Sequence, residues 1–141
     1  MLLGSGSMTL ENKRAFLRYH GLWLALGWVW IALVIFLSLT PHPPEIEMTS
    51  GDKIGHVLAY TFLMLWFCQL YRTRAKKWSI ALGLVALGIA IEFAQEQTGY
   101  RQFEIADMGA DGIGVAIGWL LGETLLANAL RQVERLQVFR Q

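Results

Sequence analysis

The sequence predicts an all-α membrane protein, a bundle of four transmembrane helices with both termini in the cytoplasm. Hydrophobic residues make up 55% of its 141 residues and charged residues only 16%, whereas charged residues form about a quarter of a soluble domain. The apolar residues gather in four long stretches, and most basic residues lie on one side of them. The formal net charge of +1 argues against a nucleic-acid-binding protein. The single cysteine, Cys68, excludes an intramolecular disulfide and a multi-cysteine zinc motif.

Each predicted helix is an apolar stretch that can cross the hydrocarbon core, which takes roughly 20 residues at about 1.5 Å per residue. The first stretch has no charge and stops at the proline-rich segment 40–44, because proline disfavours helix at and before its position. The third stretch contains one acid, Glu92, and the fourth contains Asp111 and Glu123. The predicted spans are residues 21–39, 54–71, 78–95 and 109–130.

The distribution of Lys and Arg predicts the orientation of the bundle. Ten of the twelve basic residues precede the first span, join the second to the third, or follow the fourth. Only Lys53 and Arg101 lie on the other side. Because cytoplasmic loops are enriched in Lys and Arg, we expect both termini and the central loop in the cytoplasm. The first and third loops then face outward.

The segments that flank the spans are interpreted as follows. Residues 1–7 are an expression-vector remnant before a native start at Met8, and residues 8–20 form a cytoplasmic N-terminal segment. The membrane domain covers residues 21–125. Residues 126–141 continue as an amphipathic cytoplasmic helix, which either lies on the membrane surface or projects into the cytosol.

The ionisable residues of the spans gather at the outward ends of the second, third and fourth helices. Such a group near a helix centre costs at least about 2.5 kcal/mol unless it is paired or hydrated, so three helices with such groups at one depth predict a shared polar pocket. On the second helix, spacings of four place the polar residues on one face. The residues assigned to the pocket are Asp52, Lys53, His56, Tyr60, Glu92, Gln95, Arg101, Asp107 and Asp111.

A row of glycines predicts how the fourth helix packs. Gly114, Gly118 and Gly122 repeat every four residues, and small residues at this spacing allow helices to approach closely in lipid. We expect this row to pack inside the bundle, although the same row would also suit a homodimer. The expected partner face on the third helix is the row Ser79, Gly83, Ala86 and Ala90.

The polar motifs, taken together, resemble a known family. They are the run 52–56 (DKIGH) with Tyr60, the run 92–95 (EFAQ), Arg101, and Asp107 in a glycine-rich helix start. This set resembles the VanZ-like family, from the first helix to about Gly122. The resemblance implies a small multi-span membrane protein related to an accessory protein of glycopeptide resistance linked to teicoplanin. It implies no established biochemical activity, and it suggests a bacterial inner membrane. The distribution of Lys and Arg then places the pocket on the extracytoplasmic side.

Roles can be assigned to the pocket residues as hypotheses. His56 is the candidate for proton transfer, with Asp52, one turn earlier, orienting its ring and with Glu92 and Asp107 as further catalytic partners. Lys53, Tyr60, Gln95, Arg101 and Asp111 are the candidate substrate-binding residues. The competing interpretation is structural: His56 hydrogen-bonds to Glu92 or Gln95, and the charged residues form a salt-bridged network. A divalent cation held by His56 with Glu92, Asp107 and Asp111 is possible chemistry that we do not favour, because Lys53 and Arg101 would repel it.

The expected partners follow from this pocket. They are membrane lipids and an amphiphile at the outer surface, which is a lipid-linked cell-wall precursor, a polyprenyl phosphate or an amphiphilic antibiotic. We expect the chain to recognise or modify this molecule, and whether it is an enzyme stays open. A structural or partner-binding subunit is the alternative, and a small lipid or ion transporter is less favoured because the inner half offers only Gln69 and Glu123 as polar groups.

Overall fold

The computed structural model of the chain describes residues 17–41 and 51–138, and every regular element in them is a helix. Four of these helices are long and apolar enough to cross a membrane. This confirms the prediction of an all-α protein with four candidate spans. The helices are α2 (His20–Ser38), α3 (Gly51–Leu70), α4 (Arg74–Thr98), α5 (Ile105–Glu123) and the shorter α6 (Ala129–Val138).

The helix ends differ from the predicted spans mainly at the polar residues. Helix α3 begins at Gly51 rather than at residue 54, so Asp52 and Lys53 lie in its first turn. Helix α5 begins at Ile105, one turn before the predicted start, and therefore includes Asp107. Hydropathy underestimates the length of both helices at these ends because their first turns contain charged residues. The segments 1–7 and 8–16 and the part of the first interhelical loop from residue 42 to 50 lie outside the described residues.

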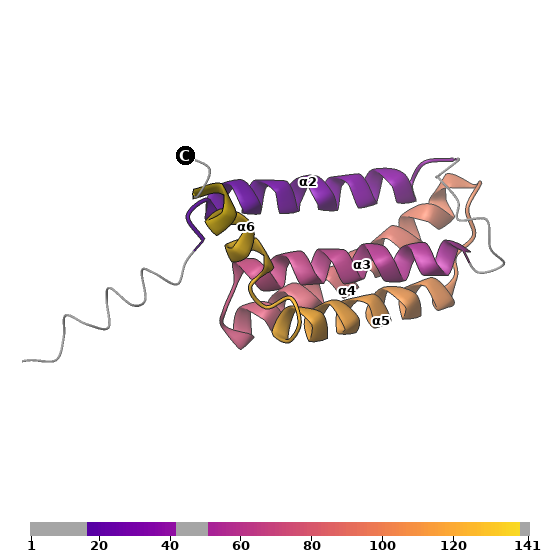
Figure 1. The fold of residues 1–141 in the computed structure, drawn as a ribbon. Coiled ribbons are helices and arrows are strands. Elements are labelled where there is room, and N and C mark those ends of the chain that lie inside the picture. Colours follow the sequence, from indigo (N-terminus) through magenta and orange to yellow (C-terminus); the bar gives the residue numbers. More distant parts are fainter. Residues whose placement is uncertain (1–16, 42–50, 139–141) are drawn as a thin grey trace, which may run out of the picture.

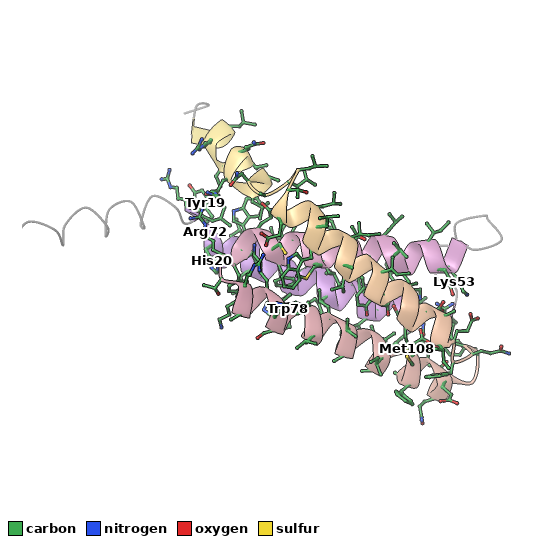
Figure 2. All side chains as sticks on the ribbon, turned by 90° about the horizontal axis from the view of Figure 1, so that it is seen from below. Tyr19, His20, Lys53, Arg72, Trp78 and Met108 are labelled. Atoms are coloured by element: carbon green, nitrogen blue, oxygen red, sulfur yellow. The ribbon has the colours of Figure 1, made fainter. Side chains whose placement is uncertain are left out.

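The chain runs back and forth, so α3 and α5 begin at the same end of the bundle (Figure 1). Figure 2 shows Tyr19, His20 and Arg72 at one end and Lys53 and Met108 at the other. We call the first of these the basic end, because Arg18 and the segments 72–77 and 131–135 lie there. The opposite end, where α3 and α5 begin and α4 finishes, is called the acidic end. The basic residues that lie on one side of the apolar stretches in the sequence therefore lie at one end of the folded bundle.

Helix α3 lies at the centre of the packing. Leu63 and Met64 are fully buried in it and join Leu84 of α4 and Val115 of α5 in one apolar core. Helix α2 packs on α3 through aromatic side chains, with Trp23 and Trp66 edge to face at a centroid distance of 5.8 Å. Dispersion contacts of this kind hold helices together in lipid, where the hydrophobic effect between helices is absent.

The glycine row of α5 packs inside the bundle, but against α3 rather than α4. A Cβ on Gly114 would lie 2.6 Å from the carbonyl oxygen of Val57, and one on Gly122 would lie 2.6 Å from the Cβ of Cys68. A Cβ on Gly118 would likewise collide with the carbonyl oxygen of Thr61. These glycines therefore bring the α5 backbone directly onto the α3 backbone.

The expected partner face on α4 is wrong. All of its members are exposed, and a Cβ on Gly83 would meet nothing within 4 Å. The small residue of α4 that does make a close approach is Gly88, which faces Asp111 and Tyr60. A repeat of small residues marks a smooth face, but it does not say which neighbour the helix turns that face towards. The rejected face is the row Ser79, Gly83, Ala86 and Ala90.

The predicted continuous helix beyond the fourth span is also wrong. The backbone of Thr124 leaves the helical region (φ −116°, ψ −97°), and five turn residues separate α5 from α6. This break allows α6 to fold beside the start of α2 (Figure 1), where its Leu130 and Glu134 are buried. The Glu134 carboxylate accepts hydrogen bonds from the backbone N–H groups of Arg18 (2.7 Å) and Tyr19 (3.0 Å). The start of a helix leaves N–H groups without partners, so this tertiary contact supplies a reason for the break.

Candidate functional site

The candidate site lies at the acidic end, where the first turns of α3 and α5 meet the last turns of α4. Helix α4 ends at Thr98, and the left-handed backbone of the next residue, Gly99 (φ 76°), turns the chain back towards α5. The returning loop is fixed by a hydrogen bond from the backbone N–H of Glu104 to Oε2 of Glu92 (3.1 Å). This short loop therefore brings the acids of α4 and α5 together.

His56 and Asp111 form the best-defined polar contact of the site. The Nδ1 atom of His56 lies 2.9 Å from Oδ1 of Asp111, and its Nε2 atom lies 3.8 Å from Oδ2 of Asp107. The Asp111 side chain is 2% exposed and the His56 side chain 10% exposed. An ionised carboxylate only accepts hydrogen bonds, so when Asp111 accepts this bond Nδ1 is the donor, and a neutral ring then leaves Nε2 as an acceptor. His56 can therefore accept a proton or bind a ligand at Nε2.

This geometry replaces two expectations about His56. Asp52 was expected to orient the ring, but that role belongs to Asp111, and the Asp52 side chain is half exposed. The structural interpretation named Glu92 or Gln95 as the partner of His56, whereas Gln95 donates a hydrogen bond to the carbonyl oxygen of Ser38 (2.9 Å). Gln95 thus ties α4 to the end of α2 and does not join the site.

Glu92, Tyr60 and Asp111 converge behind the histidine. Glu92 is fully buried, and its Oε1 atom has no hydrogen-bond partner among the described residues. The same holds for the Tyr60 hydroxyl and for Oδ2 of Asp111. Both of these atoms approach Gly88, where a Cβ would collide with Oδ2 of Asp111 and lie 3.2 Å from the Tyr60 oxygen. Gly88 therefore leaves the space in which these polar groups fit.

Two cations and two acids form the rim of the site. Lys53 lies 2.7 Å from Oε2 of Glu104 and 3.4 Å from Oδ1 of Asp107. Its hydrogen bond lowers the pKa of the Glu104 carboxyl below the usual value. Arg101 lies 3.9 Å from Asp52, and its Nε atom is buried without a hydrogen-bond partner in the described part of the chain. The expected salt-bridged network is therefore present at the rim, with Glu104 as a member, but Glu92 forms no ion pair within the described ranges.

The polar residues of the site and its rim are together called the polar cluster. Its nine members are Asp52, Lys53, His56, Tyr60, Glu92, Arg101, Glu104, Asp107 and Asp111. The five carboxylates of the cluster outnumber its two permanent cations. A buried charge without a partner is costly, so the cluster needs protons or a bound cation.

The metal-ligand geometry of the cluster differs from the set considered from the sequence. Asp52, His56 and Asp107 each offer a ligand atom, and these three atoms lie within 4.8 Å of one another. Asp111 is bonded to the opposite ring nitrogen of His56, and Glu92 lies outside this group of three. Asp111 can therefore orient the histidine ligand of such a site, and neither Asp111 nor Glu92 belongs to the group that would bind the ion.

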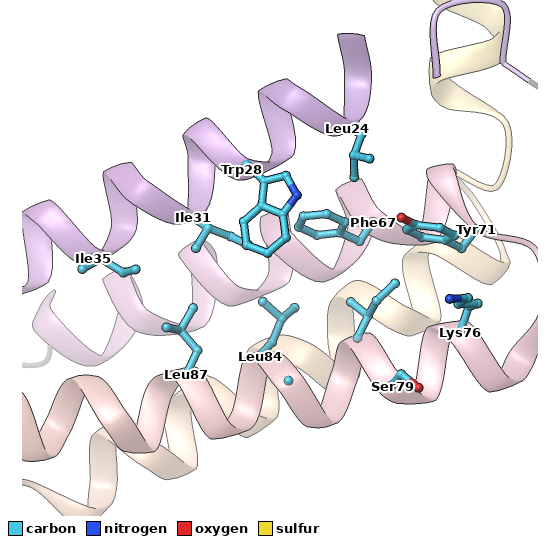
Figure 3. Close-up of a pocket in the computed structure, with 12 residues that line it drawn as sticks. Leu24, Trp28, Ile31, Ile35, Phe67, Tyr71, Lys76, Ser79, Leu84 and Leu87 are labelled. Atoms are coloured by element: carbon cyan, nitrogen blue, oxygen red, sulfur yellow. The ribbon is translucent and has the colours of Figure 1, made fainter. Parts of the chain in front are cut away.

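An apolar cavity of about 710 Å³ opens between α2 and α4, with Phe67 of α3 at its back (Figure 3). Its polar lining groups, including Lys76 and Ser79, lie towards the basic end, and Ile35 and Leu87 lie at the far end. Leu87 precedes the buried Glu92 by little more than one helical turn. The cavity therefore runs along the bundle from the basic end in the direction of the acidic end.

The basic end holds two polar contacts that sequence reasoning missed. The ammonium of the buried Lys77 pairs with the Glu123 carboxylate. Lys77 therefore makes a tertiary contact and is not only one of the basic residues that predict the orientation of the bundle. Glu134 accepts hydrogen bonds at the start of α2, including one from Nε1 of Trp23 (2.7 Å). Burial raises the pKa of Glu134, but the hydrogen bonds from Tyr19 and Arg18 outweigh this and lower the pKa below its usual value. The signal available in the sequence was the position of Glu134, an acid one turn after Leu130 on the apolar face of the predicted helix.

Comparison with known proteins adds a distant relative. The chain is 29% identical over 115 residues to the uncharacterized protein C11E3.10 of Schizosaccharomyces pombe, covering 79% of this chain and 67% of that protein. No family model matches the chain, and no solved structure matches it. The resemblance to the VanZ-like family therefore stays a prediction, as does a bacterial membrane, since this relative is a yeast protein. The chain is similar over most of its length to one eukaryotic protein and has four helices suited to a membrane.

Proposed function

We propose that this chain is a VanZ-like integral membrane protein that binds an amphiphile with a phosphate headgroup at the acidic end of its bundle. The ligand class is a polyprenyl phosphate or a lipid-linked precursor of the cell envelope. The observation that carries the proposal is the polar cluster itself, in which His56, Asp107 and Asp111 lie buried behind a rim that bears Lys53 and Arg101.

The proposal includes an orientation. The basic end faces the cytoplasm, in keeping with the enrichment of Lys and Arg in cytoplasmic loops. Both termini then lie in the cytoplasm, and the polar cluster faces the extracytoplasmic side. In a bacterium this membrane is the inner membrane.

The chemistry of the cluster suits a phosphate held at a proton-transfer group. Arg101 supplies a planar guanidinium, which pairs with phosphate oxygens at two points, and its Nε atom has no hydrogen-bond partner in residues 17–41 and 51–138. His56 offers Nε2 as a general base and becomes a general acid once protonated. The hydrocarbon tail occupies the apolar cavity between α2 and α4, whose lining runs towards this end (Figure 3).

Transport across the bilayer is less well supported. The polar cluster and the Lys77–Glu123 pair lie at opposite ends of the bundle. Between them lies an apolar core that includes Leu63 and Met64. Within the described residues, this leaves no polar path through the middle of the membrane.

Binding of a phosphate-specific probe by the full chain in nanodiscs tests the proposal. A polyprenyl phosphate should bind more tightly than the uncharged polyprenol of the same length, measured by native mass spectrometry. Arg101→Gln should weaken phosphate binding about tenfold or more, because a hydrogen bond to a charged group contributes about 1.5–3 kcal/mol. Polyprenol binding should not change.

The matched control is Arg135→Gln, which removes an exposed arginine at the basic end. It should leave phosphate binding unchanged. Equal affinity for the phosphate and the alcohol would contradict the proposal, as would equal losses in the two arginine variants. If the phosphate does not bind while variants of the cluster lose stability, the cluster serves only to lock the helices.

A further inference from the structure

His56 is held in the way that proteins commonly hold a metal-binding histidine. Such a histidine usually donates its second ring N–H to a carboxylate, which fixes the ring and makes the free nitrogen more basic. Here Nδ1 faces Oδ1 of Asp111 at 2.9 Å. The free Nε2 atom faces Oδ2 of Asp107 at 3.8 Å. The nitrogen that would bind a metal ion is therefore turned towards a second acid.

A third oxygen ligand completes this arrangement. Asp52 lies one helical turn before His56 on α3, and residues four apart share a helix face. The ligand atoms of Asp52, His56 and Asp107 all lie within 4.8 Å of one another. Two donors on one ion lie at most about 4.4 Å apart for bonds of about 2.2 Å, so a small rotation of the half-exposed Asp52 side chain closes the site.

The surrounding charges favour a cation at this position. Buried oxygens of Glu92 and Asp111 have no hydrogen-bond partner in the described part of the chain, and carboxylates outnumber cations in the polar cluster. Lys53 does not fill the gap between Asp107 and His56, because its ammonium contacts Glu104 and the other oxygen of Asp107. Without a cation, this excess of negative charge would also repel a phosphate.

We propose that Asp52, His56 and Asp107 bind one divalent metal ion, Mn²⁺ or Zn²⁺, with Asp111 orienting the histidine. While the ion is bound, Nε2 of His56 is its ligand and does not act as the general base. Two carboxylates and one imidazole suit these ions. Three protein ligands leave coordination positions open, and the phosphate of the amphiphile occupies them. This role of the ion rests on the proposed function, whereas the metal site itself rests only on the geometry of the ligands.

Metal binding by the purified full chain, with no amphiphile added, tests the site. We expect one saturable site for Mn²⁺ by electron paramagnetic resonance or for Zn²⁺ by calorimetry. Asp52→Asn should weaken binding about tenfold or more, and Asp111→Asn about 10–100-fold. The Asp52 variant is the safer one for folding, because that side chain is half exposed.

The matched control is Glu96→Gln, which also removes one exposed carboxylate at the acidic end. It should leave the affinity for the metal ion unchanged. The inference is overturned if neither ion shows saturable binding, or if Glu96→Gln weakens binding as much as Asp52→Asn. The second result would indicate diffuse attraction to the acidic end.

A second measurement separates this inference from the proposed function. If the metal ion binds but polyprenyl phosphate does not, the metal site stands and the proposed function fails. If polyprenyl phosphate binds equally well after chelation with EDTA, the role of the ion fails and the proposed function stands. We expect chelation to weaken binding of the phosphate at least tenfold and to leave binding of polyprenol unchanged.

Discussion

Replacing Gly114 by alanine tests whether the close approach of α5 to α3 builds the site. The new Cβ would lie 2.6 Å from the carbonyl oxygen of Val57 and 2.9 Å from the Cβ of Tyr60. Ordinary contacts at such a Cβ begin at 3.4 Å, so the two helices must separate by about 0.8 Å at this point. Neither obstacle is the free end of a side chain, and the strain therefore falls on the helix packing.

The expected cost is about 1–3 kcal/mol, the usual range for overpacking. The helix propensity of alanine offsets at most about 1 kcal/mol of it. Reversible unfolding of the protein in mixed detergent micelles measures the change. Separation of the helices also lengthens the contact between His56 and Asp111, now 2.9 Å, beyond normal hydrogen-bond range. The variant should therefore lose affinity for Mn²⁺ as well.

Gly112→Ala is the matched control on the same helix, because a Cβ there would meet nothing within 4 Å. It should be as stable as the parent protein or slightly more stable. The reasoning is refuted if Gly114→Ala is as stable as Gly112→Ala, whether both variants keep the stability of the parent protein or both lose it to the same degree.

The remaining predictions concern the basic end. The folded pKa of Glu134 is lowered, so its contribution to stability is present at neutral pH and is lost as the pH falls below about 4.5. Acid titration followed by the tryptophan fluorescence of the chain should show this loss, and Glu134→Gln should abolish it. A titration that is unchanged in the variant would contradict the assignment. Glu123→Gln should destabilise the protein more than Lys77→Met, because it leaves the buried Lys77 ammonium without its partner. Equal stability of the two variants in detergent unfolding would contradict this reasoning.

Length and hydropathy were sufficient to predict the four long helices, because a membrane span is defined by one continuous apolar stretch. They failed at the end of α5. Residues 124–130 are apolar enough to continue the helix, and no proline marks the break. The break becomes intelligible only from the contact of Glu134 with the start of α2, more than a hundred residues away in sequence.

The polar cluster was predictable in its location but not in its pairings. Helical spacing places Asp52, His56 and Tyr60 on one face of α3, yet it leaves the rotation of α5 against α3 open. That rotation is set by the glycine row of α5, and it turns Asp111 rather than Asp52 towards the ring of His56. Glu104 was missed because it lies in a loop, where periodicity carries no information.

Crosslinking of a photoactivatable polyprenyl phosphate most directly tests the central claim, that the acidic end binds the phosphate of an amphiphile. The reactive group sits beside the phosphate, the full chain is embedded in nanodiscs, and the adducts are mapped by peptide mass spectrometry. We expect adducts at residues 51–56 and 99–107, and their loss when unlabelled polyprenyl phosphate competes. Adducts concentrated at residues 71–79 or 129–136, at the basic end, would contradict the account.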